Sequence, residues 1–109
     1  MRLKTWNPSA SWASGALIST VEDLLVYGRA LGTDEGLLPP ERQAERLDSL
    51  SQTDTPEQTY GLGLAGARGW VGHHGLSPGF TTALFYHPEL DPVVAVEVNA
   101  DYLSGDCSP

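Results

Sequence analysis

GHHGLSPGF, at residues 72–80, is the stretch of this sequence that decides its fold. It stands between two runs of strand-like composition, residues 70–74 and 80–86. Its glycines at positions 75 and 79 suit tight turns. Because so few residues separate the two runs, they predict neighbouring strands rather than a crossover.

Two further runs extend this pattern on either side. Residues 60–64 alternate larger side chains with glycine, and residues 93–99 are rich in β-branched residues. The connection at residues 88–92 has a proline at each end and suits a hairpin. Four strands without a helix between them predict an antiparallel meander.

Two helices are expected before the sheet. The first follows a capping-box pattern at residues 19–22 and ends at Gly32. The second runs from about Pro40 to Leu50, since proline is tolerated at a first helical position. Residues 1–18 are expected to be irregular and extended, and residues 51–59 to form a surface loop. The fold class predicted is α+β, an antiparallel sheet with covering helices. The residues expected to face the core are Val21, Leu24, Leu25, Gly28 and Leu31 in the first helix, and Ala44, Leu47 and Leu50 in the second.

Composition excludes several classes of partner. The 109 residues carry 14 acidic against 6 basic side chains, a formal charge of -8, so nucleic acid is not an expected partner. No apolar run approaches the roughly 20 residues of a membrane helix, and no signal peptide is recognisable at the start. Cys107, the only cysteine, is either a free surface thiol or half of a disulfide whose partner lies outside this sequence.

The last strand indicates that the fold extends beyond these residues. Residues 93–96 are apolar at every position, which predicts burial of both faces of the strand. The two helices can cover one face of the sheet, and little of the chain is left for the other. We therefore expect 109 residues to be less than the whole fold.

The residues that could carry chemistry are few. His73 and His74 are adjacent on a strand, so only one of them is expected to enter a given cleft, and no further residues complete a metal site. Their simplest interpretation is a pair of histidines at a sheet edge. No nucleophile is recognisable, because Lys4 is the only lysine and neither Ser-x-x-Lys nor Gly-x-Ser-x-Gly occurs.

Four segments, in this order, resemble those of the serine β-lactamase, D-alanyl-D-alanine carboxypeptidase and esterase family, and its class C-like members in particular. They are SWASGALISTVEDL at residues 11–24, LLPP at 37–40, YGLGL at 60–64, and GHHG at 72–75 followed by PGF at 78–80. Each segment is a weak signal alone. Together they cover nearly the whole chain, and the resemblance implies a partial β-lactamase/transpeptidase-like fold.

The resemblance also implies a role for five residues. His73 matches the Lys or His of the family's Lys-Thr-Gly or His-x-Gly strand, and it would act as a hydrogen-bond donor to substrate or as a partner in proton transfer. Gly75 would let a substrate backbone lie along the strand, and the N–H of Leu76 would be one of two oxyanion-hole donors. His74 is the middle residue of the motif and a candidate for substrate binding. Trp12 either borders the pocket or is a core tryptophan.

By the same resemblance, residues 1–109 are the C-terminal part of a serine hydrolase. The parent enzyme would transfer acyl groups through a serine ester, without a cofactor or metal, on a peptidoglycan peptide, a β-lactam or an ester. Its Ser-x-x-Lys and Tyr-x-Asn elements are absent from this sequence, so these residues alone are expected to be inactive. Family members are typically exported to the periplasm, cell envelope or outside of the cell, and the export signal would lie upstream of this sequence. The alternative is a non-catalytic binding or interaction module derived from the same fold.

Overall fold

The computed structural model describes residues 7–33, 36–52 and 57–100. The predictions made for Lys4 and Cys107 lie outside these ranges. In chain order the elements are η2 (Pro8–Ser14), α1 (Val21–Gly32), α2 (Pro40–Asp48), η3 (Ser49–Gln52), β1 (Gln58–Tyr60), β2 (Ala65–Ala67), β3 (Trp70–Ser77), β4 (Phe80–Tyr86) and β5 (Val93–Val98).

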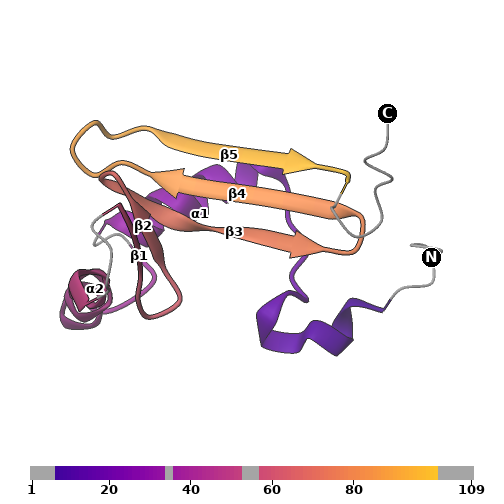
Figure 1. Ribbon diagram of the computed structural model, residues 1–109, viewed down its shortest axis with the longest axis horizontal. Helices are drawn as coiled ribbons and strands as arrows, with labels where there is room; N and C mark the ends of the chain where they lie inside the picture. Colours follow the sequence, from indigo (N-terminus) through magenta and orange to yellow (C-terminus); the bar gives the residue numbers. More distant parts are fainter. Residues whose placement is uncertain (1–6, 34–35, 53–56, 101–109) are drawn as a thin grey trace.

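The described strands form one antiparallel sheet in the order β1-β2-β3-β4-β5 (Figure 1). β3 and β4 pair along their whole length, from Val71 opposite Tyr86 to Ser77 opposite Phe80. The two residues between them, Pro78 and Gly79, make the turn, and Gly79 has a φ of 83°, the left-handed conformation that glycine adopts without strain. The predicted meander is confirmed.

The expected strand at residues 60–64 is wrong, because the chain turns there. β1 ends at Tyr60, the N–H of Gly61 donates to the Leu64 carbonyl at 2.9 Å, and β2 begins at Ala65. Gly63 has a φ of 65°, which an extended strand excludes. The alternation of glycine with larger residues therefore marks a tight turn that places Leu64, fully buried, in the core.

The N-cap of the first helix is the second residue of the capping-box pattern at 19–22, one residue later than the sequence predicts. The N-cap is Thr20, whose hydroxyl accepts a hydrogen bond from the N–H of Asp23 at 3.2 Å. A carboxylate in this first turn also interacts favourably with the helix dipole. α1 ends at Gly32, as predicted. Leu25 is exposed rather than part of the core face, while Gly28 and Leu31 are buried.

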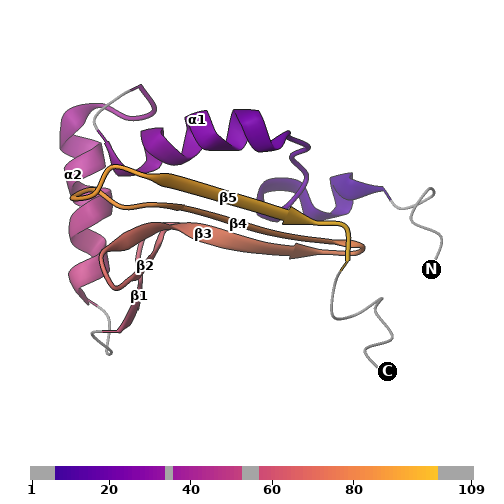
Figure 2. The ribbon, with the colours of Figure 1, turned by 90° about the horizontal axis from the view of Figure 1, so that it is seen from above.

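α1 lies along one face of β3, β4 and β5 (Figure 2). Gly28 permits this approach, because a Cβ there would lie 2.7 Å from side-chain atoms of both Leu84 and Val93. The core lies in this layer and extends to the β1–β2 turn. Its buried hydrophobic residues are Leu31, Leu64, Val71, Leu84 and Tyr86.

α2 buries a polar residue where the sequence predicts an apolar one. Ala44 is exposed, and Gln43 is 1% exposed. The Gln43 side-chain amide donates to the carbonyl of Leu31 at 2.8 Å, near the end of α1, where helical carbonyls lack partners within the helix. The inward face of this helix is thus displaced by one residue from the predicted one, although Leu47 and Leu50 do pack against the core.

The segment before α1 is partly helical rather than extended. η2 begins after Asn7, whose side-chain oxygen accepts from the N–H of Ser9 at 3.0 Å. Proline at the first position of η2 fits the fixed φ of that residue. The backbone kinks at Trp12, which has a φ of 44°. Capping by Asn7 and proline at the start therefore override the extended structure that the sequence predicts for these residues.

The second face of β5 is not buried within the described residues. Val94, Val96 and Val98 point away from α1 and are 46%, 48% and 47% exposed. Their neighbours Val93 and Ala95 pack against the core on the α1 side. As expected from the sequence, the described residues cover one face of this strand, the one toward α1, and leave the other exposed. No helix in the described segments is long and apolar enough to cross a membrane.

Asp91 joins α1 to the connection between β4 and β5. Its Oδ1 accepts hydrogen bonds from the Tyr86 hydroxyl at 2.9 Å and from the Arg29 guanidinium at 2.5 Å. These two bonds, with the positive charge of Arg29, lower the pKa of Asp91 below the usual value of a carboxyl. A lowered pKa means that the folded chain favours the ionised form.

Asp91→Asn is expected to destabilise the fold at neutral pH. Asparagine tolerates the φ of 71° at this position, so the variant removes the charge and keeps the turn. Since the pKa of Asp91 is depressed, its contribution is full above the ordinary carboxyl pKa and is lost as the pH falls through the lowered value. Urea unfolding at stepped pH measures this difference. A gap between variant and parent that persists or widens in acid would contradict the assignment, and Glu89→Gln in the same connection is the control.

Candidate functional site

β3 has a free edge over the second half of its length. β2 pairs only with residues 70–72 of β3, so among the described strands residues 73–77 have a neighbour, β4, on one side only. An unpaired strand edge presents backbone N–H and C=O groups that can pair with another extended chain. His73, Gly75 and Leu76, three of the residues singled out from the sequence, lie along this edge.

His73 lies at the point where β2 leaves β3. Its Nε2 is 2.8 Å from the hydroxyl of Tyr60, and its Nδ1 is hydrogen-bonded to the backbone carbonyl of His74. The Tyr60 and His73 rings meet edge to face, with centroids 5.4 Å apart. The imidazole is half-buried and has a partner at each nitrogen.

His74 lies closer to His73 than strand geometry predicts. Adjacent strand side chains are expected on opposite faces, yet the two imidazoles are stacked with centroids 5.5 Å apart. The ring of His73 reaches round the free edge, where no β2 residue blocks it, and meets Tyr60 and His74 there. The expectation that these two side chains lie on opposite faces is therefore wrong for the rings, because strand alternation sets the direction of the Cβ atoms and not the position of a ring at a free edge.

Two glycines of the GHHG motif have different environments. A Cβ on Gly72 would lie 1.9 Å from the carbonyl oxygen of Leu84, so β4 itself requires glycine there. A Cβ on Gly75 would meet nothing nearer than the Thr82 Cβ at 4.0 Å, and the φ of Gly75 is not positive. Neither packing nor backbone conformation within the described residues explains Gly75.

Trp12 is not a core residue, because 83% of it is exposed. The segment that carries it lies beside the end of β3: a Cβ on Gly15, which follows η2, would be 3.7 Å from the Ser77 hydroxyl (Figure 1). Leu17 and Ile18, which follow in the chain, are also almost fully exposed. The chain on either side of Gly15 therefore carries three exposed apolar side chains.

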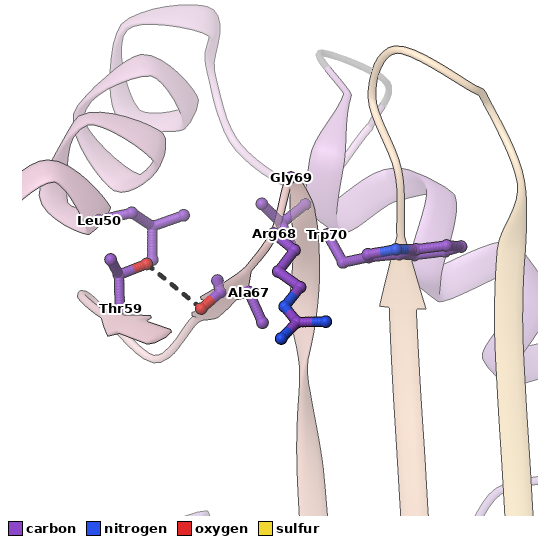
Figure 3. Close-up of a pocket in the computed structure, with 8 residues that line it drawn as sticks. Leu50, Thr59, Ala67, Arg68, Gly69 and Trp70 are labelled. Atoms are coloured by element: carbon purple, nitrogen blue, oxygen red, sulfur yellow. Dashed lines mark hydrogen bonds between the residues drawn. The ribbon is translucent and has the colours of Figure 1, made fainter. Parts of the chain in front are cut away.

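A hollow of about 160 Å³ lies at the opposite end of β3, by the β2–β3 turn (Figure 3). It is open to solvent, and Figure 3 shows Leu50 and Thr59 on one side of it and Arg68 on the other. None of the residues predicted for the site lines it. The sequence gives no signal for this hollow, because its lining comes from elements that meet only in the folded chain. Its lining residues are Leu50, Thr59, Gly66, Ala67, Arg68, Gly69, Trp70 and Val71.

The third histidine, His87, is held in the β4–β5 connection. Its Nδ1 accepts a hydrogen bond from the N–H of Leu90 at 3.2 Å, and its ring meets that of Trp70 edge to face at 5.1 Å. In the described part of the chain, no three His, Cys, Asp or Glu residues are grouped so that they could hold a metal ion.

The helices and the five antiparallel strands together form an α+β fold of the β-lactamase-like type. Residues 2–107 match the Beta-lactamase family, and the chain belongs to that family. This match confirms the resemblance drawn from the four sequence segments, and with it the predicted fold class. None of the curated proteins compared with the chain matches it. Family membership supports a superfamily of serine hydrolases that act on small molecules.

Tyr60 is the residue of the candidate site that sequence reasoning missed. The YGLGL segment resembles the family and predicts a strand, but the resemblance gives its tyrosine no chemical role. Tyr60 and His73 are 13 positions apart in the sequence, and β2 lies between their strands. A signal was nevertheless present, since both residues belong to segments that resemble the family.

Proposed function

We propose that this chain supplies one wall of the active site of a serine hydrolase that transfers acyl groups through a serine ester. The observation that carries the proposal is the free edge of β3, with His73 at its start and an unobstructed Gly75 in its middle. A substrate backbone can pair with such an edge, and a glycine without packing constraints leaves room for it.

In this proposal each residue has a distinct task. His73 interacts with the substrate or takes part in proton transfer, and Gly75 lets the substrate approach the strand. The N–H of Leu76 is one of the two donors that stabilise the developing oxyanion. His74 and Trp12 contact the substrate at the two ends of the edge. The substrate class proposed is a peptidoglycan peptide, a β-lactam or an ester.

The nucleophile in this proposal comes from residues outside this sequence. Residues 1–109 contain no Ser-x-x-Lys, and the exposed row of Val94, Val96 and Val98 supports the idea that they belong to a larger fold. The exposed Trp12, Leu17 and Ile18 favour a second candidate function, a non-catalytic module that binds a partner through these apolar side chains.

The 109-residue chain alone is expected to form no covalent adduct with a fluorescent penicillin. A serine without an activating base is a weak nucleophile, and Lys4 has no serine three residues before it. Intact-mass spectrometry after incubation measures the adduct. A stoichiometric ester on any serine of this chain would overturn the proposal that the nucleophile comes from residues outside this sequence.

The proposal itself is tested by reading the coding sequence upstream of Met1 and expressing the frame that continues there. We expect that frame to encode Ser-x-x-Lys and then Tyr-x-Asn, and its product to be acylated on the serine. A stop codon followed by a start signal directly before Met1 would contradict the proposed hydrolase function and favour the non-catalytic binding module.

A further inference from the structure

The contact between Tyr60 and His73 joins two segments that the sheet holds in register. Tyr60 pairs with Ala65 on β2, and Ala65 pairs with Gly72 on β3, so these three residues share one face of the sheet. Alanine and glycine leave almost no side chain between the phenol and β3. The Tyr60 hydroxyl therefore reaches the imidazole of the residue that follows Gly72, at 2.8 Å from Nε2.

The partners of His73 determine which of its nitrogens carries the hydrogen. A backbone carbonyl only accepts, so the bond from Nδ1 to the His74 carbonyl requires a hydrogen on Nδ1. In a neutral imidazole the other nitrogen is then an acceptor, and the Tyr60 hydroxyl donates to Nε2. The carbonyl therefore selects the Nδ1–H tautomer, and the Tyr60 hydroxyl, which can donate or accept, complements it by donating.

We propose that Tyr60 is a positioning residue that fixes the His73 ring at the edge of β3, where the His74 carbonyl holds the imidazole as the Nδ1–H tautomer. The Nε2 lone pair then accepts from the Tyr60 hydroxyl, so His73 takes up a proton through Tyr60: the hydroxyl passes its hydrogen to Nε2 and accepts one from the substrate. This consequence for catalysis rests on the proposed function. The tautomer itself is a property of the chain and is measured without any activity.

The first experiment is long-range ¹H–¹⁵N NMR of the imidazoles in the 109-residue chain, in alkaline buffer. His73 is expected to show a protonated Nδ1 and an unprotonated Nε2. His87 supplies the opposite reference in the same spectrum, because its Nδ1 accepts from Leu90 and its hydrogen is on Nε2. An Nε2–H tautomer as the main form of His73 would overturn the proposal.

The matched variants are Tyr60→Phe and Tyr27→Phe. Phenylalanine at position 60 keeps the edge-to-face ring contact and removes only the donor. It is expected to move the Nε2 resonance of His73 toward that of an imidazole nitrogen that accepts no hydrogen bond, while Nδ1 stays protonated. Tyr27, an exposed residue of α1, serves as the control for loss of a phenol, and its variant should leave the His73 signals unchanged. Unchanged His73 signals in Tyr60→Phe would refute the positioning role.

A second experiment uses the longer protein expected from the upstream frame, which carries these residues together with the serine nucleophile. It is called the acylating enzyme below. Tyr60→Phe is expected to lower kcat about tenfold with little change in KM, since it alters an acceptor rather than a binding contact. If His73→Ala abolishes activity and Tyr60→Phe does not alter kcat, the positioning role fails and the proposed function stands. If neither variant changes activity while the NMR tautomer is as expected, the proposed function fails and the tautomer assignment stands.

Discussion

Replacing His73 with alanine in the acylating enzyme is expected to lower kcat/KM by a factor of about 100 or more, the usual contribution of a positioned proton-transfer group. His73 is the imidazole at the start of the free edge of β3, hydrogen-bonded to Tyr60 there. The ring also lies next to the open strand where we propose that substrate binds. Steady-state kinetics with a chromogenic β-lactam or ester measures the loss.

His87→Ala is the matched control for that experiment. His87 contacts Trp70 and Leu90 at the β4–β5 end of the sheet, away from the free edge, so its loss is expected to change kcat/KM by less than about twofold. Thermal melting of both variants separates lost chemistry from lost structure. Equal losses of activity in the two variants would contradict the role proposed for His73 in the site.

Replacing Gly72 with alanine is expected to destabilise the fold by about 3 kcal/mol, at the upper end of overpacking effects. The added methyl group would lie 1.9 Å from the Leu84 carbonyl oxygen, a backbone atom in the middle of the sheet that cannot rotate away. β3 and β4 would have to separate at this point, next to the core residues Val71 and Leu84. Urea unfolding followed by circular dichroism measures the change.

Gly75→Ala, three residues along the same strand, is expected to change stability by less than about 0.5 kcal/mol, and in the direction of greater stability, because alanine restricts the unfolded chain. The nearest atom to its methyl group is 4.0 Å away. In the acylating enzyme the same variant is expected to weaken activity, since the methyl group would occupy the strand edge proposed for substrate. A large loss of stability in Gly75→Ala, or none in Gly72→Ala, would contradict the structural distinction between these glycines.

Much of the fold follows from short-range signals. The start of α1 depends on a hydroxyl and an N–H three residues apart, and the β3–β4 hairpin depends on the adjacent Pro78 and Gly79. Such signals are complete within a few residues, so the sequence predicts them directly. The meander and the α+β class follow from the order of these elements, and the family match confirms that class.

Two of the predictions that failed depend on residues distant in sequence. Gln43 is buried because the carbonyl of Leu31, at the end of another helix, accepts its hydrogen bond, whereas helical periodicity favours Ala44. The turn at Gly63 depends on burial of Leu64 among residues of α1, β3 and β4. A periodic pattern describes one element at a time and contains no information about the partner across the core.

In the candidate site, too, some features follow from the sequence and others depend on the tertiary structure. The sequence by itself determined that a glycine- and histidine-rich strand precedes a tight turn, and that no Ser-x-x-Lys accompanies it, because both are properties of consecutive residues. Only the tertiary structure decided that β2 leaves β3 at Gly72, that His73 turns round the freed edge, and that Tyr60 reaches its Nε2. Where a sheet edge becomes free depends on the length and register of the neighbouring strand, and those are fixed when the strands pair.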